Sequence, residues 1–356
     1  MPPAFPLPGV FDLHDLRRDD PRLDQLCAWL TDDLEIGDFA IAPASADASF
    51  RRYFRVTTAS ESRIVMDAPP DREDVAPYLA ITDMLAQMGV HAPRVLARNA
   101  EQGFLLVTDL GSITYLTELA DPVRADPLYG DALDALVRIQ RHGDPHADRL
   151  PPYDEKLLRF EMSLFPDWFV GRHLRLTFDS QQERVLAAAC DGLVANALAQ
   201  PRAFVHRDYH SRNLMYYPGD NPGILDFQDA VHGPITYDLV SLLRDCYVAW
   251  PESQVRAWAL HFRERLIDSG RPAGHDDAQF LRWFDLMGVQ RHLKAIGIFA
   301  RLWHRDGKSA YLPEIPRTLG YVRHVCQRHG ELEPLGALLD EHIAPALGAI
   351  AGSRRA

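Results

Sequence analysis

Residues 204–227, FVHRDYHSRNLMYYPGDNPGILDF, decide the fold of this 356-residue chain. They set Asp208 five residues before Asn213, and Asp226 thirteen residues after Asn213. Apolar runs lead into the HRD triplet and into Asp226, so buried strands should deliver both carboxylates to loops. The stretch is therefore predicted to form a strand, a loop, a short strand, a turn and a second short strand.

Phosphoryl transfer from ATP needs this set of side chains. One carboxylate orients or deprotonates the acceptor hydroxyl, while an amide oxygen and a second carboxylate hold Mg²⁺ across the phosphates. HRDYHSRN has the spacing of the kinase catalytic loop H-R-D-x-x-x-x-N, and GILDF supplies the later aspartate. Each element alone is commonplace, but their order and spacing together predict a kinase-like site built from Asp208, Asn213 and Asp226.

Other roles remain open for the neighbouring polar residues. His206, Asp208 and His210 alternate along the chain, so on one face of a strand they could ligate a metal by themselves. That reading leaves Asn213 and Asp226 unexplained. We expect His206 to be structural, with its ring hydrogen-bonded to backbone near the loop. Asp238, in PITYDLVSLLRD, is expected to anchor the same loop from the start of a helix.

The rest of the chain predicts two lobes. Apolar residues recur at helical spacing at Leu23, Leu26 and Leu30, and the hairpin-like runs 48–58 and 62–70 follow. From about residue 113 the pattern changes to long helical periods. We therefore expect an α+β bilobal fold, with a small β-sheet lobe over 1–108 and a larger, mainly helical lobe over 109–356.

The amino-acid composition limits the classes of partner that we expect the chain to bind. The chain carries 38 Lys and Arg against 50 Asp and Glu, a net charge of −12, which argues against nonspecific nucleic-acid or anionic-membrane binding. Four scattered cysteines without a CxxC pair suggest reduced thiols. The N-terminus has no basic region and is broken by prolines, unlike a signal peptide, and no apolar run is long enough to span a membrane. We expect a cytoplasmic protein, more probably monomeric than oligomeric.

Three motifs together resemble one enzyme family. H-x-D-x-x-x-x-N, then I-L-D-F, then G-P-x-x-Y-D-L-x-S-L-L is similar to the aminoglycoside phosphotransferase family, the small-molecule branch of the protein-kinase-like fold. DASFRRYFRV, MDAPP and HRDYHSRNLM look closer to one subgroup, the bacterial anomeric kinases of cell-wall recycling. The resemblance implies transfer of phosphate from ATP, with Mg²⁺, to the C1 hydroxyl of N-acetylmuramate and N-acetylglucosamine.

The resemblance also implies roles for single residues. Asp208 would be the catalytic base, with Asn213 and Asp226 as the Mg²⁺ ligands. The nucleotide would meet the turn between the first two strands, one of two arginines, and backbone near the lobe connection, which gives the candidates Ser45, Ala46, Asp47, Ala48, Ser49, Arg51, Arg52, Val107 and Asp109. The strand SRIVMDAPP lacks the lysine that protein kinases use on the phosphates, so an arginine of the preceding hairpin could replace it.

The acceptor should bind in the helical lobe. Glu161 and Trp168 offer a carboxylate and an aromatic face that suit a sugar, although Trp168 could equally belong to the core. Arg291 could meet the lactyl carboxylate of a muramate substrate, or could lie on a solvated helix face. Two rival functions stay open: a kinase for another alcohol, such as an aminoglycoside or choline, and an inactive kinase-like binding module.

Overall fold

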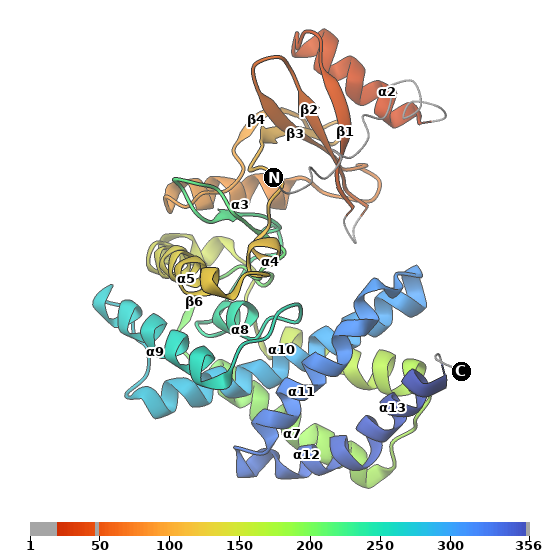
Figure 1. The fold of residues 1–356 in the computed structure, drawn as a ribbon, viewed down its shortest axis with the longest axis vertical. Helices are drawn as coiled ribbons and strands as arrows, with labels where there is room; N and C mark the ends of the chain where they lie inside the picture. Colours follow the sequence, from red (N-terminus) through yellow and green to blue (C-terminus); the bar gives the residue numbers. More distant parts are fainter. Residues whose placement is uncertain (1–19, 47–49, 354–356) are drawn as a thin grey trace, which may run out of the picture. The chain divides into compact units, whose positions relative to one another are not determined.

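The computed structural model describes residues 20–46 and 50–353, in two compact units (Figure 1). The first unit holds the described residues up to Ile113 together with Met215–Gln228. The second unit holds Thr114–Leu214 and the described residues from Asp229 onward. The expected boundary after residue 108 lies close to the end of the first segment, whereas the return of the chain to the first unit at 215–228 was not anticipated.

The first unit is built on a five-stranded antiparallel sheet. The strands follow the order β1-β2-β3-β5-β4, and in the described part of this unit α2 precedes β1 while α3 lies between β3 and β4 along the chain. The elements are α2 (Pro21–Ala28) and its π-helical extension η1 (Trp29–Asp33), β1 (Ala40–Ala46), β2 (Arg52–Thr57), β3 (Ser62–Asp67), α3 (Ala76–Gln87), β4 (Val95–Asn99) and β5 (Phe104–Thr108). The antiparallel hairpin of β2 and β3 confirms the prediction from the alternating apolar residues.

Local sequence accounts for these elements. Asp20 caps α2 by accepting a hydrogen bond from the backbone N–H of Leu23 (3.1 Å), and Pro21 occupies the first turn, where its missing N–H costs nothing. Leu26 and Leu30 then pack with Phe54 of β2 in one apolar cluster. Burial of each large apolar side chain contributes about 1.5–3 kcal/mol, so this cluster fixes α2 against the sheet.

The segment 215–228 completes the first unit. β7 (Leu214–Met215) pairs with β8 (Gly223–Ile224) as a two-stranded ribbon. The backbone N–H of Ile224 donates to the carbonyl oxygen of His91 (2.8 Å), and Phe227 packs its ring 4.9 Å from that of Tyr78 on α3. These contacts attach the strand that leads into Asp226 to the rest of the first unit.

The second unit is almost entirely helical. Its helices are α4 (Tyr115–Glu118), α5 (Ala125–His142), α6 (Glu155–Leu164), α7 (Ser180–Leu198), α8 (Tyr237–Leu243), α9 (Glu252–Asp268), α10 (Asp277–Asp306), α11 (Ile315–Cys326), α12 (Glu333–Leu338) and α13 (Ala344–Ser353). Its short strands β6 (Arg202–Val205) and β9 (Val231–Pro234) pair antiparallel. Short 3₁₀ or π segments lie between them: η2 (Pro122–Arg124), η3 (Asp144–Arg149), η4 (Phe165–His173), η5 (Ser309–Glu314), η6 (Gly330–Leu332) and η7 (Leu339–Ile343).

Helix α10 is the central element of the second unit. Asp276 caps its start by accepting from the N–H of Gln279 (2.8 Å), and Gly307 ends it in the left-handed conformation at φ 71°. It packs against α6, α7, α8 and α11. A surface helix buries one stripe, but α10 is buried on nearly all sides, including its charged residues Arg291 and Lys294.

Among the described residues, no helix is both long enough and apolar enough to cross a membrane.

Candidate active site

The catalytic-loop motif lies directly after β6 and is held by a buried aspartate. Asp238, in the first turn of α8, accepts hydrogen bonds from the backbone N–H groups of His206 (2.6 Å) and Arg207 (2.9 Å). Arg207 has φ 77°, a conformation that costs a non-glycine residue energy and persists only where neighbours impose it. Asp238 therefore fixes the backbone immediately before Asp208.

The side chains of the motif also hold the loop. His206 accepts the backbone N–H of Asp208 at Nδ1 (3.2 Å), and Asn213 donates its amide N–H to the carbonyl oxygen of Asp208 (3.0 Å). Asp245, fully buried, accepts the backbone N–H of Ser211 (2.9 Å). The carboxylate of Asp208 thus projects from a loop whose backbone is anchored on both sides, as pre-organised catalysis requires.

Positive charge surrounds Asp208. Burial works to raise the pKa of this half-buried carboxyl, but the charge of Lys294, followed by those of His210, Arg207 and Arg291, outweighs burial and lowers the pKa below its ordinary value. Asp208 is therefore ionised at neutral pH. It is suited to accept a hydrogen bond from an acceptor hydroxyl and to orient it, rather than to act as a strong base.

Glu161, which was expected to bind the acceptor, is hydrogen-bonded to other residues inside the second unit. The side chain is only 2% exposed and accepts from Arg207, from Tyr153, from Lys294 (2.9 Å) and from Gln290 (3.2 Å). Burial works to raise the pKa of Glu161, but Lys294 and then Arg207 lower it below the ordinary value. Its acceptor oxygens are used by these four donors, so the geometry gives Glu161 a positioning task for Arg207 and Lys294.

Asp226, the other predicted site carboxylate, lies in the first unit. Asp226 has φ 61°, again strained for a non-glycine residue, and accepts from the side-chain amide of Gln228 (2.9 Å). Burial raises the pKa of the neighbouring Tyr78, the charge of Arg51 lowers it, and that of Asp226 raises it further. The charges of Arg51 and Asp226 therefore both influence the pKa of the Tyr78 hydroxyl, within the first unit.

The two candidate phosphate-binding arginines differ in their partners. Arg51 lies 3.7 Å from Glu73, which also accepts the backbone N–H of Phe50 (3.1 Å). Arg52 instead donates to the fully buried Asp67 (Nε to Oδ2, 2.9 Å) and to Asp20. The charge of Arg52 is thus committed to holding α2 and β3 together, whereas the ion pair of Arg51 with Glu73 is longer.

The other nucleotide candidates fall into three groups. Asp47, Ala48 and Ser49 lie outside the described residues, and Ser45 and Ala46 end β1. Val107 is buried and paired within the sheet. Asp109 accepts from Arg55 (2.6 Å) and Ser62 (2.5 Å), and these bonds, against burial, lower its pKa. Asp109 therefore stabilises the end of β5.

The two remaining acceptor-side candidates have different surroundings. Trp168, on η4, is half-buried and stacks under the guanidinium of Arg172, 4.6 Å from its ring centre. Arg291, in the middle of α10, is only 6% exposed and acts electrostatically on Asp208. Of the two, Arg291 is the one that the structure associates with the catalytic loop.

The donor set suits magnesium. Mg²⁺ prefers oxygen ligands from one or two side chains together with the phosphates it bridges. Asn213 carries an amide oxygen and Asp226 a carboxylate, and both are ligand types that Mg²⁺ accepts. Within 20–46 and 50–353, no three His, Cys, Asp or Glu side chains gather into a metal site, so the alternating His206, Asp208 and His210 do not form one.

Sequence reasoning missed two supports of the site, Asp245 and the ion pair of Lys294 with Glu161. Asp245 falls seven residues after Asp238, just beyond the end of the apolar helix α8, a position that does not mark a loop anchor. Lys294 is buried and also donates to the hydroxyl of Tyr237 (2.9 Å). In the sequence, the only indication of this ion pair is that Lys294 falls in an apolar stretch of a helix, and that indication is weak.

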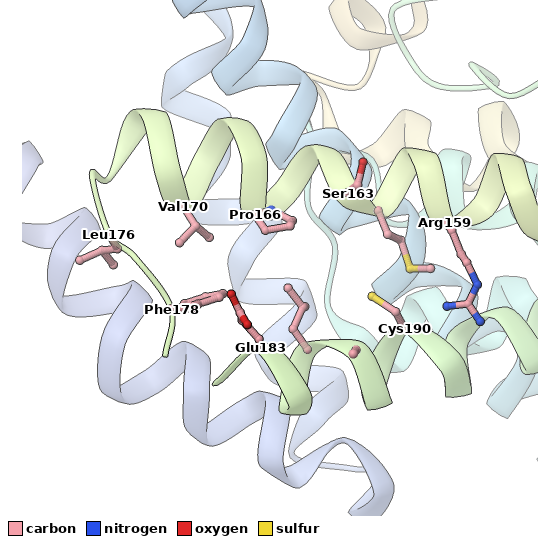
Figure 2. Close-up of a pocket in the computed structure, with 11 residues that line it drawn as sticks. Arg159, Ser163, Pro166, Val170, Leu176, Phe178, Glu183 and Cys190 are labelled. Carbon is pink, nitrogen blue, oxygen red and sulfur yellow. The ribbon is translucent and has the colours of Figure 1, made fainter. Parts of the chain in front are cut away.

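A separate cavity of about 440 Å³ lies between α6, η4 and α7 (Figure 2). Figure 2 shows Arg159 and Cys190 at one end of the lining and Leu176 and Phe178 at the other. None of the candidate site residues lines this cavity. It is therefore distinct from the group of residues around Asp208.

Three comparisons place the chain among known proteins. Residues 40–284 match the model of the phosphotransferase enzyme family. An N-acetylmuramate/N-acetylglucosamine kinase of Pseudomonas aeruginosa is 48% identical over 331 residues, covering 90% of this chain and 97% of the relative. Kinases with the same name from Neisseria meningitidis and Caulobacter vibrioides are 44% and 30% identical, covering 88% and 86% of this chain and 94% and 93% of the relatives.

Solved structures support the fold. A choline kinase of Streptococcus pneumoniae superposes with a TM-score of 0.60 at 12% identity, covering 84% of this chain and 98% of that one. The aminoglycoside 2'-phosphotransferase-IIIa, solved as its GDP complex, gives 0.60 at 13% identity, again covering 84% and 98%. These similarities confirm the bilobal kinase-like fold predicted from the three motifs, in which an N-terminal antiparallel sheet precedes a mainly helical unit.

Proposed function

Because this chain belongs to the phosphotransferase enzyme family, we propose that it is an ATP-dependent kinase for the anomeric C1 hydroxyl of N-acetylmuramate and N-acetylglucosamine. The observation that carries the proposal is the 48% identity, over nine-tenths of this chain, to a kinase named for these two sugars. Such a cytoplasmic enzyme would return cell-wall amino sugars to metabolism.

The proposed mechanism assigns one task to Asp208. Its carboxylate accepts a hydrogen bond from the C1 hydroxyl and turns the oxygen lone pair toward the terminal phosphate of the nucleotide. The new bond joins O1 to phosphorus, the bond from phosphorus to the bridging oxygen of ADP breaks, and the hydroxyl proton leaves to Asp208 or water. A hemiacetal hydroxyl is more acidic than an ordinary alcohol. The lowered pKa of Asp208 therefore suits this acceptor.

The remaining site residues bind and position. We propose Asn213 and Asp226 as ligands of Mg²⁺, which neutralises phosphate charge when bound. Arg51 would bind a phosphate in place of the missing strand lysine, with Glu73 holding its guanidinium. Residues 45–49, Val107 and Asp109 would contribute backbone groups, and Arg291 would face the acceptor.

The test is acceptor-dependent release of ADP from Mg-ATP across N-acetylmuramate, N-acetylglucosamine, glucose, kanamycin and choline. We expect turnover with the two N-acetylated sugars and a C1 phosphate product by ³¹P NMR. Asp208→Asn should lose about 10²–10⁴ of kcat while still binding Mg-ATP. Turnover with kanamycin or choline alone would refute the proposed acceptor, and an Asp208→Asn enzyme as fast as the parent would refute the mechanism.

A further inference from the structure

Arg291 stands apart from the other buried cations of the second unit. Arg244 pairs with Asp285 (2.7 Å), and Lys294 pairs with Glu161 (2.9 Å). In the described part of the chain no carboxylate lies within ion-pair distance of Arg291, although the charges of Asp208 and Asp245 act on it from farther away. Its side-chain hydrogen-bond partner there is the sulfur of Cys246, 3.9 Å from Nη1. Its Nε is buried without a hydrogen-bond partner.

A buried charge without a directly paired counter-ion is costly. Taking a guanidinium out of water without a contacting anion costs several kcal/mol, and each unused N–H adds to that cost. Arginine cannot escape by losing its proton, because its pKa lies far above neutrality. A buried cation that carboxylates reach only from a distance is expected where a bound ligand supplies a contacting anion.

The position of Arg291 in the fold indicates which ligand could supply this anion. Its neighbour Cys246 is flanked by Asp245, which holds the N–H of Ser211 (2.9 Å), and by Tyr247, whose ring lies 5.4 Å from that of His210. Arg291 thus lies beside the segment that packs on the catalytic loop. His210 likewise has a buried ring nitrogen, Nδ1, without a partner. Two polar atoms without hydrogen-bond partners among the described residues therefore lie beside the loop that carries Asp208.

We infer that Arg291 binds the carboxylate of an acidic acceptor, the lactyl group of N-acetylmuramate, and so sets the preference between the two sugars. The inference rests on the proposed function. The two sugars differ only in the lactyl ether at O3, and only that ether carries a negative charge. A guanidinium matches a carboxylate with two parallel N–H donors, which a neutral hydroxyl cannot match.

The experiment combines two arginine variants with three acceptors. Arg291→Gln and Arg291→Lys are compared with the parent and with Arg301→Gln, an arginine three turns along the same helix that takes no part in the proposed site. The acceptors are N-acetylmuramate, N-acetylglucosamine and the neutral amide of the N-acetylmuramate lactyl group. The values of kcat and KM are measured for each pair.

We expect Arg291→Gln to lower kcat/KM for N-acetylmuramate about tenfold to a hundredfold, mostly through KM, because the contact is remote from the reacting oxygen. N-acetylglucosamine should change less than about threefold, and Arg301→Gln should change neither. The parent should discriminate against the amide by a similar factor, and Arg291→Gln should erase that discrimination. Arg291→Lys should be intermediate.

Three results would overturn the inference. If the parent enzyme uses the acid and its amide equally well, it does not recognise the carboxylate. This result does not depend on whether any variant folds. An equal loss for both sugars in Arg291→Gln would make Arg291 a positioning residue for Asp208 instead. A selective rise in the KM for ATP would assign it to the nucleotide. Failure of the parent on every sugar would refute the proposed function itself.

Discussion

Arg51 and Arg52 are adjacent in sequence, yet their partners assign them different tasks. Arg52 neutralises the buried Asp67 together with Arg22 (Nε to Oδ1, 2.9 Å), whereas Arg51 pairs loosely with the half-buried Glu73. Alternation along a β-strand sends neighbouring side chains to opposite faces. One arginine can therefore stabilise the fold while the other serves a ligand.

We predict that Arg51→Gln and Arg52→Gln have opposite phenotypes. Arg52→Gln should lower the free energy of unfolding by about 1–3 kcal/mol in urea, because Asp67 keeps only one of its cations, with KM for ATP unchanged. Arg51→Gln should raise KM for ATP about tenfold at nearly unchanged stability. Each variant is the control for the other, and an unchanged KM in Arg51→Gln would remove Arg51 from the site.

Asp285 predicts how stability depends on pH. Burial alone would raise its pKa, but the hydrogen bond from His329 and the charge of Arg244 lower it to about 2, from 3.8. A depressed folded pKa means that the unfolded chain binds protons more readily. Stability from this carboxylate is therefore complete above about pH 4 and is lost as pH falls through about 2, and it amounts to roughly 2 kcal/mol.

The check is urea unfolding of the parent and Asp285→Asn between pH 3 and pH 7. The variant should be less stable at pH 7 by at least about 2 kcal/mol, and the gap should narrow toward pH 3. Asp340→Asn removes an exposed partner of Arg323 and should differ from the parent by less than about 1 kcal/mol throughout. A gap that stays constant with pH would show that Asp285 contributes by packing alone.

At the scale of elements, the contact between α10 and the end of α6 depends on one glycine. A Cβ added at Gly297 would lie 2.4 Å from the carbonyl carbon of Leu164 and 2.6 Å from its Cβ. Backbone cannot retreat as a flexible side chain can. The two helices would have to separate, and the interior of the second unit would loosen.

We therefore predict that Gly297→Ala lowers the free energy of unfolding by about 1–3 kcal/mol, measured by thermal or urea unfolding. Gly320→Ala is the matched control. Gly320 lies inside α11 with nothing within 4 Å of its added Cβ, so the gain in helix propensity should stabilise the protein by up to about 1 kcal/mol. Equal stability of the two variants would contradict the close approach of the helices.

The elements themselves were largely predictable from sequence, and their charged partners were not. Apolar periodicity predicted the β2–β3 hairpin and the long helices, because burial of apolar faces dominates where those elements form. Periodicity does not tell which partner a buried charge meets. Glu161 was expected to face a sugar and is used by Arg207 and Lys294, and Arg291 is buried although charged helix residues usually lie in water.

The catalytic motif was predictable for a different reason. Asp208 and Asn213 act through one short loop, so their spacing is written directly into the sequence. The anchoring role of Asp238 could likewise be predicted from its local sequence. The positive φ of Arg207 could not, because it depends on contacts in three dimensions. The division of Asp208 and Asp226 between two structural units also left no mark in the sequence, because it depends on packing between segments distant along the chain.

At the scale of the whole molecule, nucleotide binding should be visible as stability. A ligand that binds only the folded state stabilises it by about 2.7 kcal/mol at a hundredfold excess over Kd. We predict that Mg-ATP raises the Tm of the parent and of Asp208→Asn alike. Asp226→Asn should lose most of that increase, because it lacks a proposed Mg²⁺ ligand, and ATP with EDTA is the control. A full Tm increase in Asp226→Asn would remove it from the metal site.

The return of residues 215–228 to the first unit has a consequence for biosynthesis. The ring of Phe227, the β8 strand and the bond from the N–H of Tyr216 to the carbonyl oxygen of Ile113 (2.8 Å) all come from this late segment. A ribosome adding about 5–20 residues per second needs on the order of 10 s to travel from residue 113 to residue 228. For that interval the nascent sheet has emerged without the ribbon that covers Tyr78 and Leu110. Most of the first unit is therefore translated before the second, but its folding cannot be completed until residues 215–228 have been synthesised.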